Sequence, residues 1–378
     1  MRYRLVSEEL MKFIAYSAQN TPLTGGPEPR PLYAGTPESR ALREEFLNAA
    51  GDLNQRIADD PSIDPFAMRQ FMSQLGRSLT RYDFEDFPAD AEAWAAGASV
   101  LFLDEHGELY DVHRRKVFSG EAPAAILNAR ALDRAQSIRN TLSKQGFLVD
   151  STAIPVPDVA EMLLPAASDV VDRVICLAVL VDSARELWRG KNPDMQAIAD
   201  RYDLALVTLT DSEQRLFELF ARIAPLDKEQ RQSGMAAVAE VLDQAVVVET
   251  LAWCVGLLGD DDIPADRIGT AHAHPINLVN PKALFVPKRL LSRSLEELYQ
   301  TASYRTLEEI CVAHEYVSSL DRLALAQREA LADGESIAGE LLQEAQVATV
   351  RMRALAFAWL TLPYASWDEL VDRSNRLA

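Results

Sequence analysis

Helix start signals recur along the last two thirds of the chain, and they constrain its fold more than any other feature. In a capping box, a Ser or Thr hydroxyl accepts a hydrogen bond from the amide three residues on, and a Glu at that position bonds back to the first amide. The four boxes are Thr210 with Glu213, Ser294 with Glu297, Thr306 with Glu309, and Ser366 with Glu369. Each precedes apolar residues at helical spacing. The sequence from residue 131 onward therefore predicts a mostly α-helical domain, with its helices packed as a bundle or in orthogonal pairs.

The helix that follows Thr306 has the clearest pattern. Its apolar positions, interrupted only at Gln327, are Ile310, Ala313, Val317, Leu320, Ala324 and Leu331. This spacing predicts a seam that packs against a second helix. We expect Gly334 to end the first helix and a partner helix to run from about Ser336 to Leu360. The residues expected on the inner face of the partner are Leu341, Ala345, Ala348, Met352, Leu355 and Trp359.

The first 130 residues are organised differently and are predicted to form an accessory module. A short helix is expected over residues 7–18, and two longer helices begin at Thr36-Pro37 and Asp64-Pro65, where a capping side chain precedes a proline. Apolar segments within residues 99–112 flank Asp104-Glu105-His106-Gly107, which fits a type I turn. We therefore predict an N-terminal helical module (1–130) that contains one β-hairpin, followed by a helical domain (131–378).

Charge and cysteine content narrow the class of protein. The 378 residues carry a net charge of −19, from 57 acidic and 38 basic residues. Such a protein repels phosphate groups, so we expect no nucleic-acid partner. Cys176, Cys254 and Cys311 lie in apolar helical patterns, which predicts reduced core cysteines in a cytoplasmic protein. The sequence predicts no signal peptide, no membrane-spanning segment and no membrane partner.

Two histidines two residues apart are the first candidates for chemistry. His272 and His274 follow Asp261 and three other aspartates in the same segment. Two imidazoles with carboxylates can bind a divalent metal such as zinc. The competing interpretation is a loop in which His274 precedes Pro275 and the aspartates follow a helix end. Because no other histidine stands close in sequence, we expect no cofactor and keep a divalent metal as the alternative.

Glu249 is the second candidate, because it is the only charged residue between Asp243 and Asp260. A carboxylate on an apolar helix is costly to bury unless it is paired or protonated. Such a group can act as a general base, bind a metal ion or form an ion pair. We expect an ion pair with Arg351 or Arg353 of the C-terminal helix.

Cys311 and His314 are the third candidates, because they lie three residues apart on one face of the helix that begins at Thr306. The pair has the form of a catalytic nucleophile with its base, or of half a metal site. No oxyanion donor or orienting acid is evident beside it. We therefore expect a core cysteine next to a partly exposed histidine.

Several segments, taken in order, carry a resemblance to a known family. They are Asn140–Phe147, Leu209–Glu213, Glu249–Gly259, Arg351–Leu355 with Trp359, and Trp367-Asp368. From about Ser137 to Ala378 the chain resembles an uncharacterised bacterial family, domain of unknown function 4272. The family often has an acid before the arginines of its last segment, where this chain has Thr349-Val350. The resemblance implies a helical domain and no particular activity.

Common enzyme motifs are absent from the sequence, which has no phosphate-binding glycine loop, dinucleotide fingerprint or nucleophile elbow. This favours a non-enzymatic helical interaction or regulatory protein. The predicted partner is another protein of basic charge, as for an immunity protein that neutralises a toxin. A homodimer formed through the hairpin around Gly107 is also considered. The alternative function is a metal-dependent hydrolase centred on His272 and His274, with Asp261 or Glu249 as further ligand or base.

Overall fold

The structure is a computed structural model in which helices predominate, as the sequence predicts. It describes residues 12–19, 22–58, 64–88, 91–117, 125–202, 204, 207, 209–227, 229–258, 283–361 and 367–368. The chain divides into two compact units. The first is formed by Met1–Asp133 and Pro157–Leu163, and the second by Arg134–Val156 and Leu164–Ala378. Within the described residues, no helix is long and apolar enough to cross a membrane.

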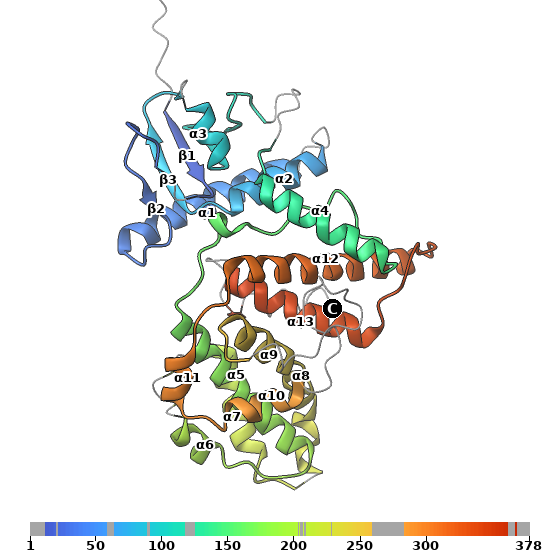
Figure 1. The fold of residues 1–378 in the computed structure, drawn as a ribbon. Helices are drawn as coiled ribbons and strands as arrows, with labels where there is room; N and C mark the ends of the chain where they lie inside the picture. The colour runs from blue at the N-terminus through green and yellow to red at the C-terminus, as the bar shows by residue number, and fades with distance from the viewer. Residues whose placement is uncertain are drawn as a thin grey trace, which may run out of the picture. The chain divides into compact units, whose positions relative to one another are not determined.

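The first unit is built on a five-stranded antiparallel sheet (Figure 1). Its strands are β1 (Phe13–Ser17), β2 (Arg30–Pro31), β3 (Thr80–Phe84), β4 (Val100–Asp104) and β5 (Leu109–Tyr110), in the spatial order β2-β3-β1-β4-β5. Strands β4 and β5 form the predicted hairpin. In its turn, Asp104 Oδ1 accepts hydrogen bonds from the amides of His106 and Glu108 at 2.9 Å, and Gly107 has a φ of 73°. The turn chemistry therefore sets the hairpin, but the hairpin belongs to a larger sheet.

The prediction of a helix over residues 7–18 is wrong, because Phe13–Ser17 forms the central strand of that sheet. Phe13 and Ala15 face one core cluster, whereas Ile14 and Tyr16 face the other. Since both faces of the strand are covered, apolar residues occupy consecutive positions and no polar alternation identifies a strand. Its partners β3 and β4 are distant in sequence, so the pairing depends on tertiary contacts.

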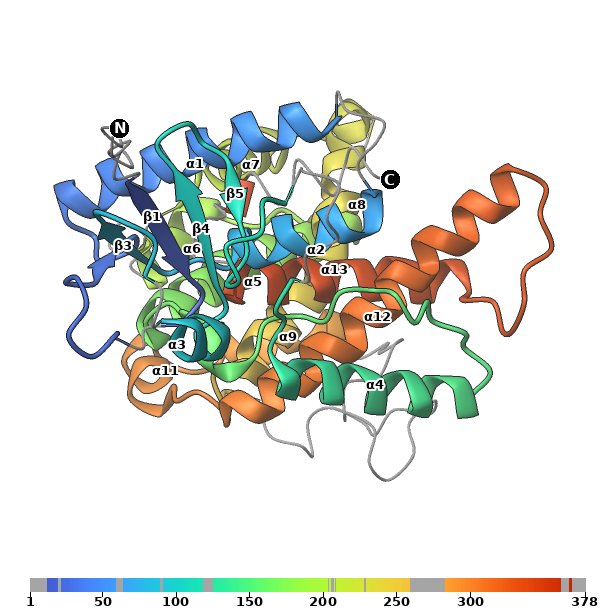
Figure 2. The ribbon, with the colours of Figure 1, turned by 90° about the horizontal axis from the view of Figure 1, so that it is seen from above.

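Helices cover both faces of the sheet, as Figure 2 shows for α1 and α3. Helices α1 (Pro37–Ala58) and α2 (Pro65–Gly76) begin at the two predicted prolines and pack on the face that includes Tyr16. Helix α3 (Glu92–Gly97) packs on the opposite face, against Phe102. The unit therefore has three layers, which are α1 with α2, the sheet, and the short helix α3.

A second segment completes the first unit through a buried ion pair. The 3-10 helix η1 (Val159–Glu161) places Glu161 Oε2 at 3.3 Å from Arg77 Nη1, and both side chains are buried. The other carboxylate oxygen of Glu161 accepts a hydrogen bond from Ser99 Oγ at 3.4 Å. These contacts hold Pro157–Leu163 to the end of α2 and the start of β4.

The second unit is a helical domain arranged around α5 (Ala167–Trp188), as Figure 1 shows. The apolar residues of α5 are almost all buried. The other helices described in this unit are α4 (Ala129–Lys144, which begins in the first unit), α6 (Met195–Arg201), α7 (Asp211–Ile223), α8 (Met235–Asp243), α9 (Ala245–Cys254), α10 (Val286–Leu290), α11 (Leu295–Thr301), α12 (Leu307–Ala332) and α13 (Glu344–Thr361), and 3-10 turns lie at Gln230–Gly234 and Ala283–Phe285. Helices α7 to α11 pack against α5. The capping boxes at Thr210, Ser294 and Thr306 are confirmed, and the box at Ser366 and Glu369 includes residues outside the described part.

Helix α13 packs against α12 as predicted, but it begins at Glu344 and not near Ser336. Gln327 explains the difference, because its side chain bonds to the connecting loop. Its Nε2 donates to the Glu340 carbonyl at 2.8 Å, and its Oε1 accepts from the Leu342 amide at 3.1 Å. The predicted inner face was therefore partly wrong: Leu341, Ala345 and Ala348 are exposed, as is Leu331 of α12, and the buried residues of α13 include Val350, Arg353, Phe357 and Leu360.

Gly339 of this loop is required by a close approach of two backbones. The amide of Glu340 donates to the Gly146 carbonyl at 2.8 Å, and a Cβ on Gly339 would lie 2.5 Å from the same oxygen. We expect Gly339→Ala, at a φ of 88°, to lower the free energy of unfolding by about 2–3 kcal/mol, from strain and clash together.

Gly334 provides a matched control for Gly339, because its φ is 73° and no atom lies within 4 Å of its Cβ position. We expect Gly334→Ala to cost only the conformational strain, about 1 kcal/mol. Urea denaturation of both variants measures the difference. Equal losses of stability would show that the contact with Gly146 contributes nothing.

Candidate functional site

Glu249 of α9 and Arg353 of α13 form an ion pair in the interior of the second unit. Glu249 Oε2 lies 2.7 Å from Arg353 Nη2, and both side chains are essentially inaccessible to water. Of the two expected partners, the structure therefore has Arg353 in contact. Arg351 lies 3.9 Å from Asp321 of α12 instead. Both arginines thus have carboxylate partners on other helices, although Thr349-Val350 supplies none.

The geometry of the Glu249 pair favours a structural role over a chemical one. A guanidinium that contacts a carboxylate oxygen at hydrogen-bond distance occupies that oxygen and fixes its position. Without water access, neither a substrate nor a hydrated metal ion can reach that oxygen in this conformation. The pair joins α9 to α13, which also pack together along their apolar faces.

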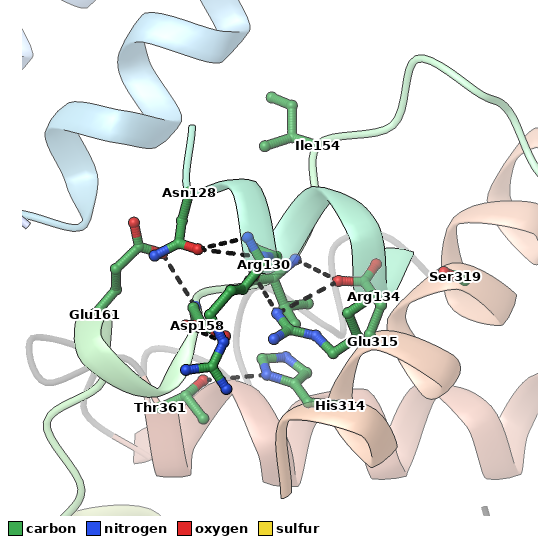
Figure 3. A network of polar contacts seen from close by, with 12 residues as sticks. Asn128, Arg130, Arg134, Ile154, Asp158, Glu161, His314, Glu315, Ser319 and Thr361 are labelled. Carbon is green, nitrogen blue, oxygen red and sulfur yellow. Dashed lines mark hydrogen bonds and ion pairs between the residues drawn. The ribbon is translucent and has the colours of Figure 1, made fainter. Parts of the chain in front are cut away.

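His314 is buried, so the expectation that it is partly exposed was wrong (Figure 3). Its ring stacks on Phe357 of α13 with centroids 5.4 Å apart and an interplanar angle of 14°. Its Nδ1 lies 3.5 Å from Thr361 Oγ1, also on α13. Cys311 lies on the same helix as His314 and is fully buried. The histidine therefore packs against α13, and the enclosed thiol is not presented to a substrate.

All three cysteines are buried and none forms a disulfide, as the sequence predicts. Burial raises the pKa of the Cys176 thiol from 9.0 to about 12, and it also raises the pKa of Cys254. Thiol reagents attack the thiolate. We therefore expect Ellman's reagent at pH 8 to react with the native protein only at the rate of unfolding, and to titrate three thiols in denaturant.

The raised thiol pKa of Cys176 also predicts the direction of an alkaline effect. The folded protein holds the thiol proton more tightly than the unfolded chain does. The stability contribution is therefore complete below pH 9 and is lost as the pH rises from 9 toward 12. Replacement by the uncharged Cys176→Ala should remove this part of the alkaline loss, which urea denaturation at pH 8 and pH 10.5 measures.

Glu315 of α12 is a buried carboxylate that the sequence analysis missed (Figure 3). Its Oε2 accepts a hydrogen bond from the Val156 amide at 2.7 Å and lies 4.0 Å from Arg134 Nη2. Its Oε1 accepts from Arg322 Nη2 at 3.0 Å. Arg322 Nη2 also lies 3.4 Å from the Ser319 hydroxyl. One carboxylate therefore joins α4, α12 and the segment that follows α4.

Three arginines hold the backbone of that segment, residues 150–156. Arg139 donates from Nη1 to the Ser151 carbonyl at 2.8 Å, and Arg322 Nη1 donates to the Ile154 carbonyl at 2.6 Å. Arg134 Nη2 donates to the Val156 carbonyl at 2.9 Å. Because each guanidinium bonds to main-chain oxygens, the cluster fixes a loop that has no secondary structure of its own.

A pattern in the sequence would have identified Glu315. It lies four residues from both Cys311 and Ser319, so the three share one face of the helix. Cys311 and Ser319 are small residues on a helix that packs against α13, and an acid between them is placed in the interior. Of the other acids of α12, Glu308, Glu309 and Glu329 are exposed and Asp321 is half-buried, and together they obscure this fully buried one.

The other proposed metal ligands belong to one segment between α9 and the 3-10 turn at Ala283–Phe285. His272, His274 and Asp261 lie in residues 259–282, outside the described part of the chain. Among the residues that are described, no group of three or more His, Cys, Asp or Glu side chains is placed to hold a metal ion. The convergence of His272 and His274 with Glu249 therefore stays a prediction.

Arg173 of α5 brings together segments from the middle and the end of the chain. It forms an ion pair with Glu213, the capping glutamate of α7, and lies over the rings of Trp359 and Trp367 at 5.8 and 6.0 Å. The two indoles pack edge to face, with centroids 6.2 Å apart. These residues tie α5, α7 and the end of α13 into one cluster.

Asp368 extends this cluster to the first turn of α7. Its Oδ2 accepts a hydrogen bond from the Ser212 amide at 3.3 Å, and its Oδ1 accepts from the Ser212 hydroxyl. Burial alone would raise the pKa of Asp368, but hydrogen bonds from Ser212 and Thr210 lower it below the ordinary value. The segment after α13 therefore supplies a negative charge to the N-terminus of a helix, where it is stabilising.

Comparison with known families shows a match over the part of the chain that holds these contacts. The family model described as a domain of unknown function, DUF4272, matches residues 134–370. The chain belongs to the DUF4272 family. No curated protein and no solved structure gives a significant match. The DUF4272 match begins at Arg134, where the second compact unit also begins.

Membership in DUF4272 agrees with the resemblance seen in the sequence, and the structure shows what three of the resembling segments do. Leu209–Glu213 and Trp367-Asp368 meet at Arg173, and Arg351–Leu355 supplies the arginine that pairs with Glu249. In this chain the DUF4272 segments are thus packing and pairing elements. The sheet of the first unit precedes the matched residues.

Proposed function

We propose that this DUF4272 protein is a non-enzymatic binding protein whose acidic surface takes a basic protein partner. A basic toxin that the protein neutralises, as an immunity protein does, is one such partner, and a basic regulatory domain is another. The net charge of −19 supports a partner of positive charge. It also disfavours an anionic partner such as nucleic acid.

The observation that carries the proposal is that arginines of the second unit donate hydrogen bonds to main-chain oxygens. Arg231 is buried and donates from Nε to the Ile223 carbonyl at 3.1 Å and from Nη1 to the Lys191 carbonyl at 2.9 Å. Arg139 likewise donates to main-chain oxygens. These two guanidinium groups pair with main-chain oxygens and not with surface carboxylates. The chain has 57 acidic and 38 basic residues, and this excess of acids suits electrostatic attraction of a basic protein.

The candidates for chemistry that the structure describes support the non-enzymatic half of the proposal. Glu249 is engaged by Arg353, His314 stacks on Phe357, and Cys311 is enclosed. Each has a packing or pairing role within the domain. These contacts account for the burial of the three side chains, and none of them requires access for a substrate.

Affinity capture from the organism that encodes the chain tests the binding function. The immobilised protein should retain a host protein with a basic isoelectric point. After separate purification, that protein should form a complex whose affinity falls at least tenfold between 0.05 and 0.5 M NaCl, because salt screens exposed charges (Debye length about 10 Å at 0.1 M). Recovery of no basic partner, or an affinity that does not change with salt, contradicts the proposal.

Metal analysis tests the competing hydrolase hypothesis. Protein purified without a histidine tag is expected to contain metal well below one ion per chain by plasma mass spectrometry. The content should be the same in His272→Ala, because the proposed function needs no metal at His272 and His274. A stoichiometric metal that is lost in this variant would favour the hydrolase.

A further inference from the structure

Three exposed leucines lie at the corner of the second unit where α4 ends and α12 connects to α13; this connection projects in Figure 2. Leu331 is 60% exposed, Leu341 51% and Leu148 50%. Most leucines of this unit are buried in its core. Large exposed apolar side chains that occur together are typical of a binding surface.

Contacts within the corner keep these leucines together. Gln327 bonds to the backbone on both sides of Leu341, and Leu331 lies one helical turn beyond Gln327. Leu148 packs beside Gly339, whose Cβ position lies 3.1 Å from Leu148 Cγ. The patch therefore has an internal scaffold that holds its leucines in place.

Negative charge surrounds the leucines. The exposed carboxylates of the corner are Glu329, Asp333, Glu335, Glu340 and Glu344. Within the described part of the chain, none of these five forms an ion pair. Two cations, Lys144 and Arg328, lie in the same stretches of sequence and leave the acids in excess. We call the three leucines and five carboxylates the acidic corner.

We propose that the acidic corner binds an amphipathic α-helix of a partner protein, with apolar residues on one face and Lys or Arg along its edges. This inference rests on the proposed function and assigns it a surface. The apolar face of the helix would cover the leucines, and its cations would meet the carboxylates. A second copy of this chain is disfavoured as the occupant, because it carries the same negative corner and a net charge of −19.

The backbone of the corner favours a helix over an added strand. The Glu340 amide and carbonyl and the Leu342 amide are already hydrogen bonded within the domain. An added strand needs unpaired main-chain groups along an edge. Recognition at this loop therefore takes place through side chains, which a helix presents.

A designed peptide of leucine and lysine tests the occupant. The probe is an 18-residue fluorescent peptide whose leucines recur at helical spacing with lysines elsewhere. A scrambled peptide of the same composition keeps the charge but has no apolar face, and a leucine–glutamate peptide reverses the charge. We expect the scrambled peptide to bind at least tenfold more weakly by fluorescence anisotropy, and the acidic peptide not to bind. Equal binding of the scrambled peptide overturns the proposal.

Substitutions in the corner test the surface. The double variant Leu331→Asp with Leu341→Asp should weaken binding of the leucine–lysine peptide at least tenfold. Leu47→Asp is the matched control, because Leu47 is an exposed leucine of α1 in the first unit, and it should bind as the unmodified protein does. Since all three positions are exposed, the melting temperatures should stay close to that of the unmodified protein.

Charge reversal provides the second pair of variants. Glu335→Lys with Glu340→Lys should weaken peptide binding at least fivefold, whereas Glu28→Lys with Glu44→Lys, at exposed sites of the first unit, should have less than a twofold effect. The proposal is overturned if corner and control variants lose affinity equally. It is also overturned if Leu341→Asp changes the sedimentation of the protein from dimer to monomer, since the corner would then be covered by a second copy.

The two proposals fail in different ways. If the protein captures a basic host partner whose affinity the corner variants leave unchanged, the acidic corner is not the binding surface, and the proposed function stands. If no basic host protein binds, the proposed function fails, whatever the designed peptide does.

Discussion

Replacing Arg353 by methionine is expected to lower the free energy of unfolding of the second unit by about 3–5 kcal/mol, because the Glu249 carboxylate would lose its guanidinium contact in the interior. The two side chains have almost no contact with water, so solvent cannot replace the lost guanidinium. Four of the five tryptophans lie in this unit, at positions 188, 253, 359 and 367, so tryptophan fluorescence in a urea titration reports mainly on its unfolding.

Two further variants separate the buried charge from the loss of a long side chain. Arg351→Met removes the neighbouring arginine, which is partly exposed and 3.9 Å from Asp321, and should cost no more than about 1 kcal/mol. The double variant Glu249→Leu with Arg353→Met removes both charges and should lie within about 1 kcal/mol of the unmodified protein, or above it. A double variant as unstable as Arg353→Met alone would show that packing, and not charge, explains the effect.

Replacing Glu315 by alanine is the second large expected effect, with a loss of about 3–5 kcal/mol, because Arg134 would lose its contact with this carboxylate and the Val156 amide would lose its acceptor. Arg322 is partly exposed and can turn to water, whereas the Arg134 side chain is buried and cannot. Hydrogen exchange measured by mass spectrometry gives the local readout. Peptides covering residues 150–156 should exchange much faster in the variant, because the carboxylate anchors that segment.

Glu329→Ala is the control for Glu315, since it removes an exposed acid from the same helix and should change stability by less than about 0.5 kcal/mol. Glu315→Gln keeps an acceptor for the Val156 amide but removes the charge, so it should fall between the control and the alanine variant. If exchange in residues 150–156 is unchanged in Glu315→Ala, the carboxylate does not anchor the segment.

The two buried glutamates show how much of the candidate site the local sequence pattern can predict. Glu249 was identified because it is the only charge in a long apolar stretch, and such a charge needs a partner. Glu315 was missed because α12 carries many exposed acids, and only the helical register separates it from them. His314 was expected to be partly exposed because its burial depends on Phe357, which belongs to another helix.

The helix pair α12 and α13 shows the same limit for the fold. Gly334 follows the C-cap of α12 at a φ of 73°, as its position suggested, because local chain geometry at a helix end favours glycine. The start of α13 was misplaced by eight residues or so, because Gln327 and Gly146 bind the intervening loop from a distance along the chain. Helical propensity over residues 336–343 could not reveal those contacts.

The residues along the chain determined what depends on near neighbours: the helical class of the second unit, the capped starts at Thr210, Ser294 and Thr306, and the turn at Gly107. Tertiary structure alone decided the central place of Phe13–Ser17 in a sheet and the choice of Arg353 over Arg351 as the partner of Glu249. It also decided that Leu331 and Leu341 are exposed together. Hydrogen bonds within one helical turn are set by adjacent residues, whereas strand pairing, charge burial and surface patches depend on segments that only folding brings together.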